Sequence, residues 1–374
     1  MPARDVPRAV RDIDPSRDPR WDAYVAAHPD GVVYHGAGWL RALQREYGRV
    51  PVALAVEGRD GALHGVLALM ATSGLPFGRG GELAGRRLAS LPRTPIAGPL
   101  ADDRDGLALL VRAARERLPA GARLQLKLAG PWLDGVDPQL QGRPWRLSYS
   151  RALPGPGEEL RFGAGRNHAR IRSNVTRATD AGVTVRPAER IGELRAWHRL
   201  YLATMREHLV PARPWGLFAA LWEELRPHGQ MRLLLAERRG ELLAGTLLLM
   251  SSSTVFYAFG ASRRSALALS PNDVLQWRGL HDAAAEGYAR YDLGEVPEGN
   301  EGLARFKRKW GAQATRLHRY GLAAADPAPA PAPAPPGDAH AIGEGPVALL
   351  ARRAWRRVPL GATALAGRIV YRYL

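Results

Sequence analysis

The second half of the chain contains an ordered series of strand and helix patterns that few folds accommodate. Strand-type alternation at residues 183–185 precedes two helical patterns with apolar residues three and four positions apart. Three strands follow, and Ser270-Pro271-Asn272-Asp273 supplies a capping serine, a first-position proline and an acidic first turn. The expected elements are strand 183–185, helices 194–208 and 215–225, strands 231–237, 242–250 and 255–259, helix 271–288, strand 291–294, helix 301–310 and strand 314–320.

This order predicts an α/β domain with mixed α+β sheets, and it resembles that of GNAT acyltransferases. The first half gives a looser version of the same order, with helices 20–27, 39–47 and 105–118 and strands 52–56, 65–70, 123–128 and 145–149. We therefore expect two tandem GNAT-like domains. The predicted organisation is an N-terminal domain at 1–160, a C-terminal domain at 161–322, a Pro/Ala-rich linker at 323–345 and a basic tail at 346–374.

A stretch without charged residues, 242–262, is long enough to suggest a membrane span. Gly245 and the serines at 251–253 divide it, so two neighbouring buried strands joined by a turn are the better interpretation. The chain has 374 residues and no cysteine, which excludes disulfides, zinc–thiolate sites and a cysteine nucleophile. The N-terminal residues lack an apolar targeting segment, which favours a cytoplasmic protein.

The net charge of +17 is concentrated in three segments, 161–177, 301–320 and 346–374. Such local basic surfaces favour polyanionic partners, namely RNA, nucleotide phosphates or acidic lipid. Of the 53 basic residues, only Lys127, Lys307 and Lys309 are lysine. Lysine offers a compact charge that the planar arginine fork does not reproduce, so the two clustered lysines are functional candidates.

The tail after the Pro/Ala-rich linker has a basic and an apolar side. From Val347, apolar residues share one helical face and four arginines, 352, 353, 356 and 357, occupy the other. Pro359 ends this helix, and a second short helix is expected before Leu374. One interpretation is peripheral binding to the anionic inner face of the cell membrane. The alternative is a helix that packs back on the body of the protein.

Three motifs resemble the Fem family of peptidoglycan-bridge aminoacyltransferases and their FemAB-like relatives with a BioF2-like acetyltransferase domain. The most specific is YDLG at 291–294, followed by Gly302-Leu303 and RFKRKWG at 305–311. RNHARIR at 166–172 is similar to the family's basic helix, and YHGAGWL at 34–40 to its N-terminal motif. The resemblance spans roughly residues 21–321 and excludes the tail.

The resemblance implies transfer of an aminoacyl group from aminoacyl-tRNA to an amine on a cell-wall precursor, without a metal. It places Phe306 and Lys307 in the acyl-transfer channel and makes Trp39 a substrate contact. His35 stands where the family often has a polar amide, and the tRNA-gripping helical arm of some members is absent. The substrate-binding candidates are Trp39, His35, Arg166, Arg170, Asn272, Arg305 and Lys309.

Roles for Lys307 and Asp292 can also be inferred from the sequence without the resemblance. With Leu303, Phe306 and Trp310 on the buried stripe of their helix, Lys307 falls at its edge. An ammonium there can stabilise the oxyanion of an acyl-transfer intermediate, or it can be a snorkelling rim lysine. Asp292, at a strand end, can orient an amine or hold Lys307, or it can be a structural carboxylate.

Acyl-CoA is the alternative donor. GNAT enzymes hold its pyrophosphate with a glycine-rich turn at a helix N-terminus, but residues 261–270 contain no glycine. An acyl-CoA-dependent N-acyltransferase of an envelope sugar or metabolite amine therefore stays as the second hypothesis, and a non-catalytic membrane-associated adaptor as the third. No metal-binding histidine spacing is present, and neither a cofactor nor DNA binding is expected.

Overall fold

The computed structural model describes residues 8–74, 85–92, 94–155, 157–322 and 355–373, which fall into two compact units. Of the described residues, those in 8–146, 316–322 and 372–373 form unit 1, and those in 147–315 and 355–371 form unit 2. The division therefore lies before the boundary expected near residue 160. It does so because two long strands, β7 (Leu140–Ala152) and β13 (Gln313–Leu322), each contribute residues to both units.

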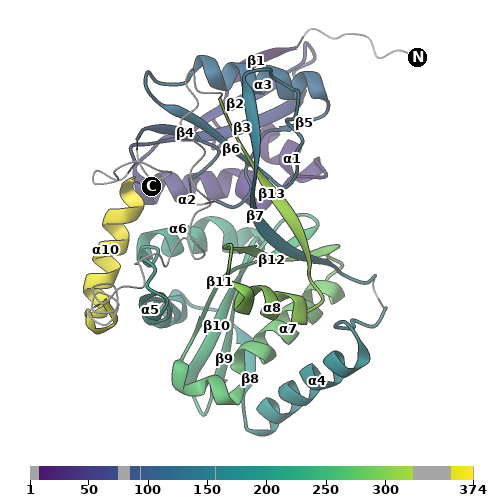
Figure 1. The fold of residues 1–374 in the computed structure, drawn as a ribbon, viewed down its shortest axis with the longest axis vertical. Coiled ribbons are helices and arrows are strands. Elements are labelled where there is room, and N and C mark those ends of the chain that lie inside the picture. Colours follow the sequence, from purple (N-terminus) through teal and green to yellow (C-terminus); the bar gives the residue numbers. More distant parts are fainter. Residues whose placement is uncertain (1–7, 75–84, 93, 156, 323–354, 374) are drawn as a thin grey trace. The chain divides into compact units, whose positions relative to one another are not determined.

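Unit 1 is a mixed sheet packed against helices (Figure 1). Its strand order is β1-β2-β3-β4-β6-β13, with β5 paired to β3, and β4 and β6 are parallel. Leu54, Val56, Leu67 and Leu69 pack against the apolar side of α3, and the alternate residues of these strands are buried as well. The elements are β1 (Ala9–Asp12), α1 (Pro19–Ala27), α2 (Ala37–Tyr47), β2 (Val52–Glu57), β3 (Leu63–Thr72), β4 (Arg87–Ala89), β5 (Leu100–Ala101), α3 (Arg104–Glu116) and β6 (Arg123–Leu128).

From β8 to α8, unit 2 has the element order predicted from the sequence, but the last predicted strand, 314–320, lies mostly in unit 1, where β13 pairs with β6. The strands lie in the order β7-β12-β11-β10-β9-β8, and only β11 and β12 are parallel. Helices α4 and α7 share one apolar core with β9 and β10, while α5 contacts β10 and β11. The elements are α4 (Gly165–Asp180), β8 (Thr184–Pro187), α5 (Ile191–Glu207), α6 (Trp215–Leu225), β9 (Met231–Arg238), β10 (Glu241–Met250), β11 (Thr254–Ser262), α7 (Pro271–Ala285), β12 (Arg290–Val296) and α8 (Glu301–Lys309).

The uncharged stretch 242–262 forms the antiparallel pair β10 and β11, as predicted. Gly245 allows close packing inside β10 rather than a break in the strand. A Cβ at this position would lie 2.5 Å from Cδ1 of Trp197, whose Nε1 donates a hydrogen bond to the Gly245 carbonyl at 3.0 Å. No helix in the described part of the chain is long and apolar enough to span a bilayer.

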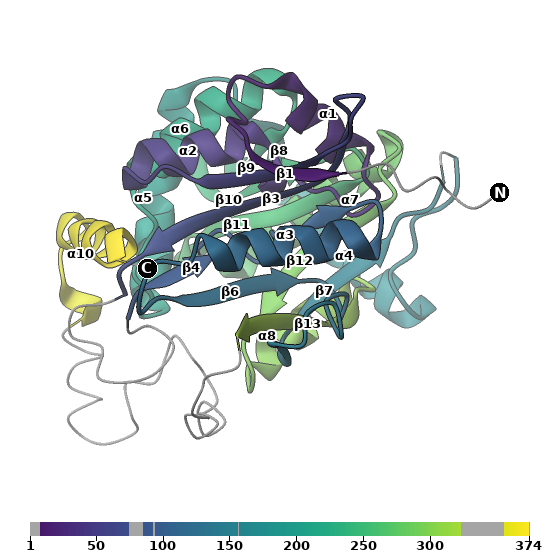
Figure 2. The ribbon, with the colours of Figure 1, turned by 90° about the horizontal axis from the view of Figure 1, so that it is seen from above.

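The described part of the basic tail packs on unit 2, as the alternative interpretation of the sequence predicted. Helix α10 (Leu360–Tyr373) follows Pro359 and lies beside α5 (Figure 2). Tyr371 Oη donates to the Pro211 carbonyl at 3.1 Å, and Arg206 Nη1 donates to the Val358 carbonyl at 2.9 Å. The helix expected from Val347 lies mainly outside the described residues.

His35, one of the predicted substrate contacts, is buried in unit 1 with 4% exposure. Its Nδ1 accepts a hydrogen bond from the Val32 amide at 3.2 Å, so the proton lies on Nε2, which donates to the Gly98 carbonyl at 3.1 Å. Burial lowers the pKa of His35 to about 4. The imidazole is therefore neutral in the folded protein near neutral pH.

The buried His35 predicts a pH dependence of stability. The unfolded chain protonates this residue below its ordinary pKa of 6.5, whereas the folded chain does so only near 4. The unfolded state binds more protons in that range, so stability falls by about 3 kcal/mol as the pH drops through it. Denaturant unfolding of the wild type and of His35→Gln between pH 7 and pH 4 measures this, since glutamine keeps a donor and an acceptor without titrating. Equal pH slopes for the two proteins would contradict the assignment.

Candidate functional site

The parallel strands β11 and β12 pair over only three residues. Thr254, Val255 and Phe256 pair with Arg290, Tyr291 and Asp292, whereas β11 continues to Ser262 and β12 to Val296. Beyond these three pairs the two strands are no longer hydrogen-bonded to each other. The N–H and C=O groups that each strand directs toward the other therefore have no partner there. Because buried carbonyls need donors, side chains must reach them.

A bulge in β12 aims two of these carbonyls at α8. On β7, Ser150 and Ser148 pair with Asp292 and Glu295, so β12 has one residue more than its partner. Gly294 lies in this bulge with a φ of +79°, a conformation that favours glycine. Lys307 Nζ donates to the Gly294 carbonyl at 2.7 Å and to the Glu295 carbonyl at 3.0 Å.

Lys307 is the buried cation of this region, with 4% exposure. Helix α8 presents it because Asn300 caps the helix, its side chain accepting from the Leu303 amide at 3.1 Å. Burial lowers the pKa of Lys307 to about 8, while Asp292 and Glu295 oppose the shift. Two of its three N–H groups bond to carbonyls, which leaves one for a further acceptor.

Asp292 lies two residues before Gly294 and is also buried. Its Oδ1 accepts from the Gly294 amide at 2.5 Å, which fixes the carboxylate inside the bulge. Burial raises the pKa of Asp292 to about 6, although this amide and the Lys307 charge favour the ionised form. The structure thus brings together Asp292, Lys307 and the half-buried Phe306, the three residues predicted to be catalytic.

Lys309, the other clustered lysine, is committed to an ion pair. Its Nζ lies 2.7 Å from both carboxylate oxygens of Asp273 on α7, and Asn174 of α4 donates to Oδ2 of the same carboxylate at 2.9 Å. Because these groups are mostly buried, the ammonium links three helices and is occupied by protein. The prediction that Lys309 binds substrate has no support in this geometry, whereas Arg305 is exposed on the same helix.

Helix α4 carries a repeated Asn–Arg pair that sequence reasoning missed. Arg170 donates to the Asn167 Oδ1 at 3.0 Å, and seven residues later Arg177 donates to the Asn174 Oδ1 at 3.0 Å. Each asparagine turns its amino group to the body, where Asn167 reaches the Lys309 carbonyl at 2.7 Å. Arg166, Arg170 and Arg177 are exposed, and the Asn-x-x-Arg spacing in the sequence was a readable signal of this arrangement.

The N-terminus of α7, where GNAT enzymes bind pyrophosphate, is poor in free amides. Pro271 occupies the first helical position and has no N–H, and the Asp273 amide already donates to the Ser270 carbonyl at 3.0 Å. The Asp273 carboxylate adds negative charge to this first turn. Asn272, a predicted substrate contact, is half-buried at the second position of the helix.

The N-terminal candidates belong to unit 1. Trp39 is 2% exposed and packs edge-on against Tyr34 with ring centroids 4.9 Å apart. Its Nε1 has no hydrogen-bond partner among the described residues. The proposed substrate contacts of Trp39 and His35 stay predictions.

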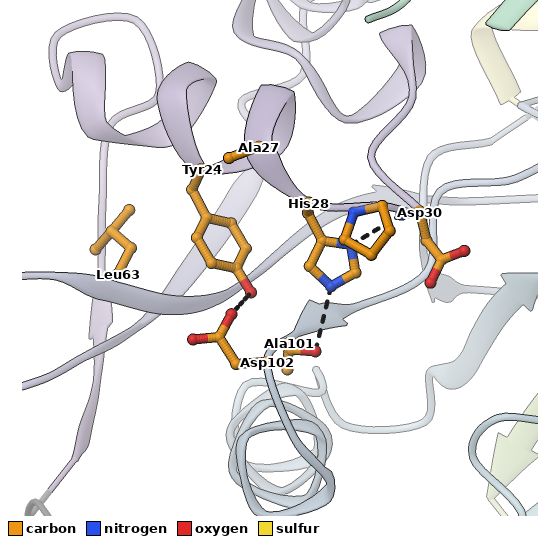
Figure 3. Close-up of a pocket in the computed structure, with 8 residues that line it drawn as sticks. Tyr24, Ala27, His28, Asp30, Leu63, Ala101 and Asp102 are labelled. Carbon is orange, nitrogen blue, oxygen red and sulfur yellow. Dashed lines mark hydrogen bonds between the residues drawn. The ribbon is translucent and has the colours of Figure 1, made fainter. Parts of the chain in front are cut away.

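A surface pocket of about 630 Å³ in unit 1 contains none of the predicted site residues (Figure 3). Three of its polar side chains, those of Tyr24, His28 and Asp102, are already hydrogen-bonded. Tyr24 donates to Asp102 at 2.9 Å, and His28 Nε2 donates to the Ala101 carbonyl at 3.2 Å. Within the described ranges, no group of three or more His, Asp or Glu side chains could hold a metal ion.

Comparison with known proteins agrees with this architecture. Residues 165–308 match the model of an acetyltransferase (GNAT) domain. The structure is similar to that of FemX, with a TM-score of 0.64 and 18% identity over 83% of this chain and 96% of FemX. No curated protein matches the sequence.

Two further solved structures share the fold. The C-terminal domain of a protein from Agrobacterium fabrum described as a lysylphosphatidylglycerol synthetase has a TM-score of 0.56 and 16% identity, with 83% of this chain and 93% of that one covered. L-PGS from Bacillus licheniformis has a TM-score of 0.53 and 13% identity, with the same coverage. The chain therefore has a FemX-like fold in which residues 165–308 match a GNAT acetyltransferase domain.

Proposed function

We propose that the protein is a FemAB-like transferase that moves an aminoacyl group onto an amine of a cell-wall or other envelope precursor. The observation that carries the proposal is the buried Lys307 ammonium beside the point where β11 and β12 lose their pairing. The likeness to FemX and to lysylphosphatidylglycerol synthetases supports an aminoacyl donor and an envelope acceptor. We place the reaction in the cytoplasm, near the inner face of the membrane, where a lipid-linked acceptor is found.

In the proposed mechanism, the free N–H of Lys307 faces the carbonyl oxygen of the donor ester. When the acceptor amine attacks the ester carbon, that oxygen gains negative charge, and a fixed ammonium stabilises it without having to reorganise. The intermediate then breaks its bond to the ribose oxygen of the tRNA, which leaves as a hydroxyl with the proton that the amine gives up. The two backbone carbonyls that hold Lys307 keep it in position before the substrate arrives. Phe306 forms part of the apolar wall of the acyl path.

Asp292 acts in this proposal as a positioning residue. Its negative charge raises the pKa of Lys307 and so keeps the ammonium charged inside a buried site. Through the Gly294 amide it also holds the bulge that directs the carbonyls at Lys307.

The exposed arginines of α4 are the proposed contacts for the donor's phosphates. Asparagine partners restrain Arg170 and Arg177, which reduces the entropy lost when a polyanion binds. The first turn of α7 offers a pyrophosphate a proline and a carboxylate instead of free amides. This favours aminoacyl-tRNA over acyl-CoA as the donor.

Lys307→Ala is expected to lower kcat by about 10²- to 10³-fold, because it removes one oxyanion donor. Lys309→Ala is the matched control, since it breaks the Asp273 ion pair on the same helix. We expect Lys309→Ala to lower the melting temperature clearly and the activity only slightly. Thermal unfolding and single-turnover transfer measure the two effects. A Lys307→Ala protein that folds normally and retains full function in cells would eliminate the catalytic role and leave the adaptor hypothesis.

The pH profile tests the coupling between Asp292 and Lys307. Activity is expected to fall as Lys307 loses its proton, giving an alkaline limb near pH 8. Asp292→Asn removes the charge that raises the Lys307 pKa, so the limb should move to lower pH, while Glu298→Gln, on an exposed residue, should leave it in place. The measurement is kcat/KM against pH, with spontaneous ester hydrolysis subtracted. An unmoved limb in Asp292→Asn would refute this role.

Binding measurements identify the donor. The protein should bind aminoacyl-tRNA with an affinity that falls steeply with salt, since phosphate contacts release counterions. The triple variant Arg166→Gln/Arg170→Gln/Arg177→Gln should bind more weakly and with a smaller salt slope. Tight binding of acetyl-CoA in calorimetry, together with no retention of charged tRNA, would instead support the acyl-CoA-dependent N-acyltransferase.

A further inference from the structure

Helix α10 has two distinct faces, and one of them is occupied by unit 2. Thr363, Gly367 and Tyr371 are buried at positions four residues apart, so they lie on one side of the helix. A Cβ on Gly367 would lie 2.0 Å from the Ala212 carbonyl oxygen, and only glycine allows so close an approach. Arg213 lies over the Tyr371 ring at 5.1 Å. These contacts fix which side of α10 faces outward.

The outward side combines apolar and basic residues. Leu365 and Ile369 are 58% and 53% exposed, although both are large aliphatic residues. At ~100° per residue they point away from the packed face, and Arg368 lies beside them. Arg356 and Arg357, just before the helix, are exposed too, and residues 355–373 contain no acidic residue.

We propose that this outward face, formed by Leu365, Ile369, Arg356, Arg357 and Arg368, binds an anionic lipid surface while α10 stays packed on unit 2. Two exposed aliphatic side chains among arginines, with no acid between them, suit the interface between acyl chains and acidic headgroups. A second copy of this chain is a poorer occupant, because it would bring two arginine-rich surfaces together. The proposal does not depend on the transferase reaction.

Vesicle flotation of the full chain tests the proposal. At low salt the protein should float with vesicles of phosphatidylcholine and phosphatidylglycerol, and not with vesicles of phosphatidylcholine alone. Leu365→Gln/Ile369→Gln should weaken binding about tenfold, the effect of withdrawing roughly one fully buried aliphatic side chain. Arg356→Gln/Arg357→Gln/Arg368→Gln should weaken it by about two orders of magnitude, at roughly 1 kcal/mol for each arginine.

The matched control is Ile191→Gln/Leu267→Gln, which removes two aliphatic side chains that are 43% and 50% exposed elsewhere in unit 2. This variant should bind like the wild type. Hydrogen exchange on the vesicles should leave the amides of 362–371 protected, because the helix remains packed. Loss of that protection would overturn the packed arrangement.

Three other results would overturn the proposal: no binding to anionic vesicles, equal binding to both kinds of vesicle, or unchanged binding by both α10 variants. A fourth is a dimer in size-exclusion chromatography that Leu365→Gln/Ile369→Gln dissociates, without vesicle binding by either protein. That result would make a second copy of the chain the occupant of this face.

Discussion

Backbone carbonyls that lose a strand partner must find another donor, and in unit 2 that requirement falls on Lys307. The separation of β11 and β12, the bulge at Gly294 and the cap at Asn300 all contribute to the position of this one ammonium. The same contacts make Lys307 part of the fold. A residue proposed to stabilise charge in a reaction therefore also satisfies the backbone in the resting protein, and the two roles need the same geometry.

The contacts of the two clustered lysines explain one of them in this arginine-rich chain. Lys307 places a small tetrahedral ammonium between two neighbouring carbonyls, and Lys309 places one at equal distance from two carboxylate oxygens. A planar guanidinium would not place a single nitrogen between the two carbonyls that Lys307 contacts, whereas the Asp273 carboxylate could accept a bidentate arginine at position 309. The scarcity of lysine in the sequence thus indicated both Lys307 and Lys309 as candidates. It did not distinguish the lysine of an ion pair from the candidate catalytic lysine.

The sequence predicted the order of elements in unit 2 because each helix and strand has its own periodicity. Residues 242–262 were assigned correctly to two strands from the serine turn at 251–253, whereas Gly245 lies inside β10 and marks no break. Long-range contacts could not be predicted in this way. The bulge at Gly294 depends on the register between β7 and β12, and the partner of Lys309 lies 36 residues earlier on another helix. The burial of His35 likewise depends on Gly98, which no local pattern connects to it.

The fixed orientation of the side-chain amides of Asn167 and Asn174 on α4 restricts which residues can replace them. Asn174 donates to Asp273 with its amino group and accepts from Arg177 with its oxygen, so its two ends are not interchangeable. An aspartate there would keep Arg177 as a partner, but it would lose the donor to Asp273 and place a second carboxylate against it. Among homologous chains, position 174 should therefore change to an acid only when position 273 loses its charge. In an alignment, positions 174 and 273 would then covary because α4 and α7 are in contact there.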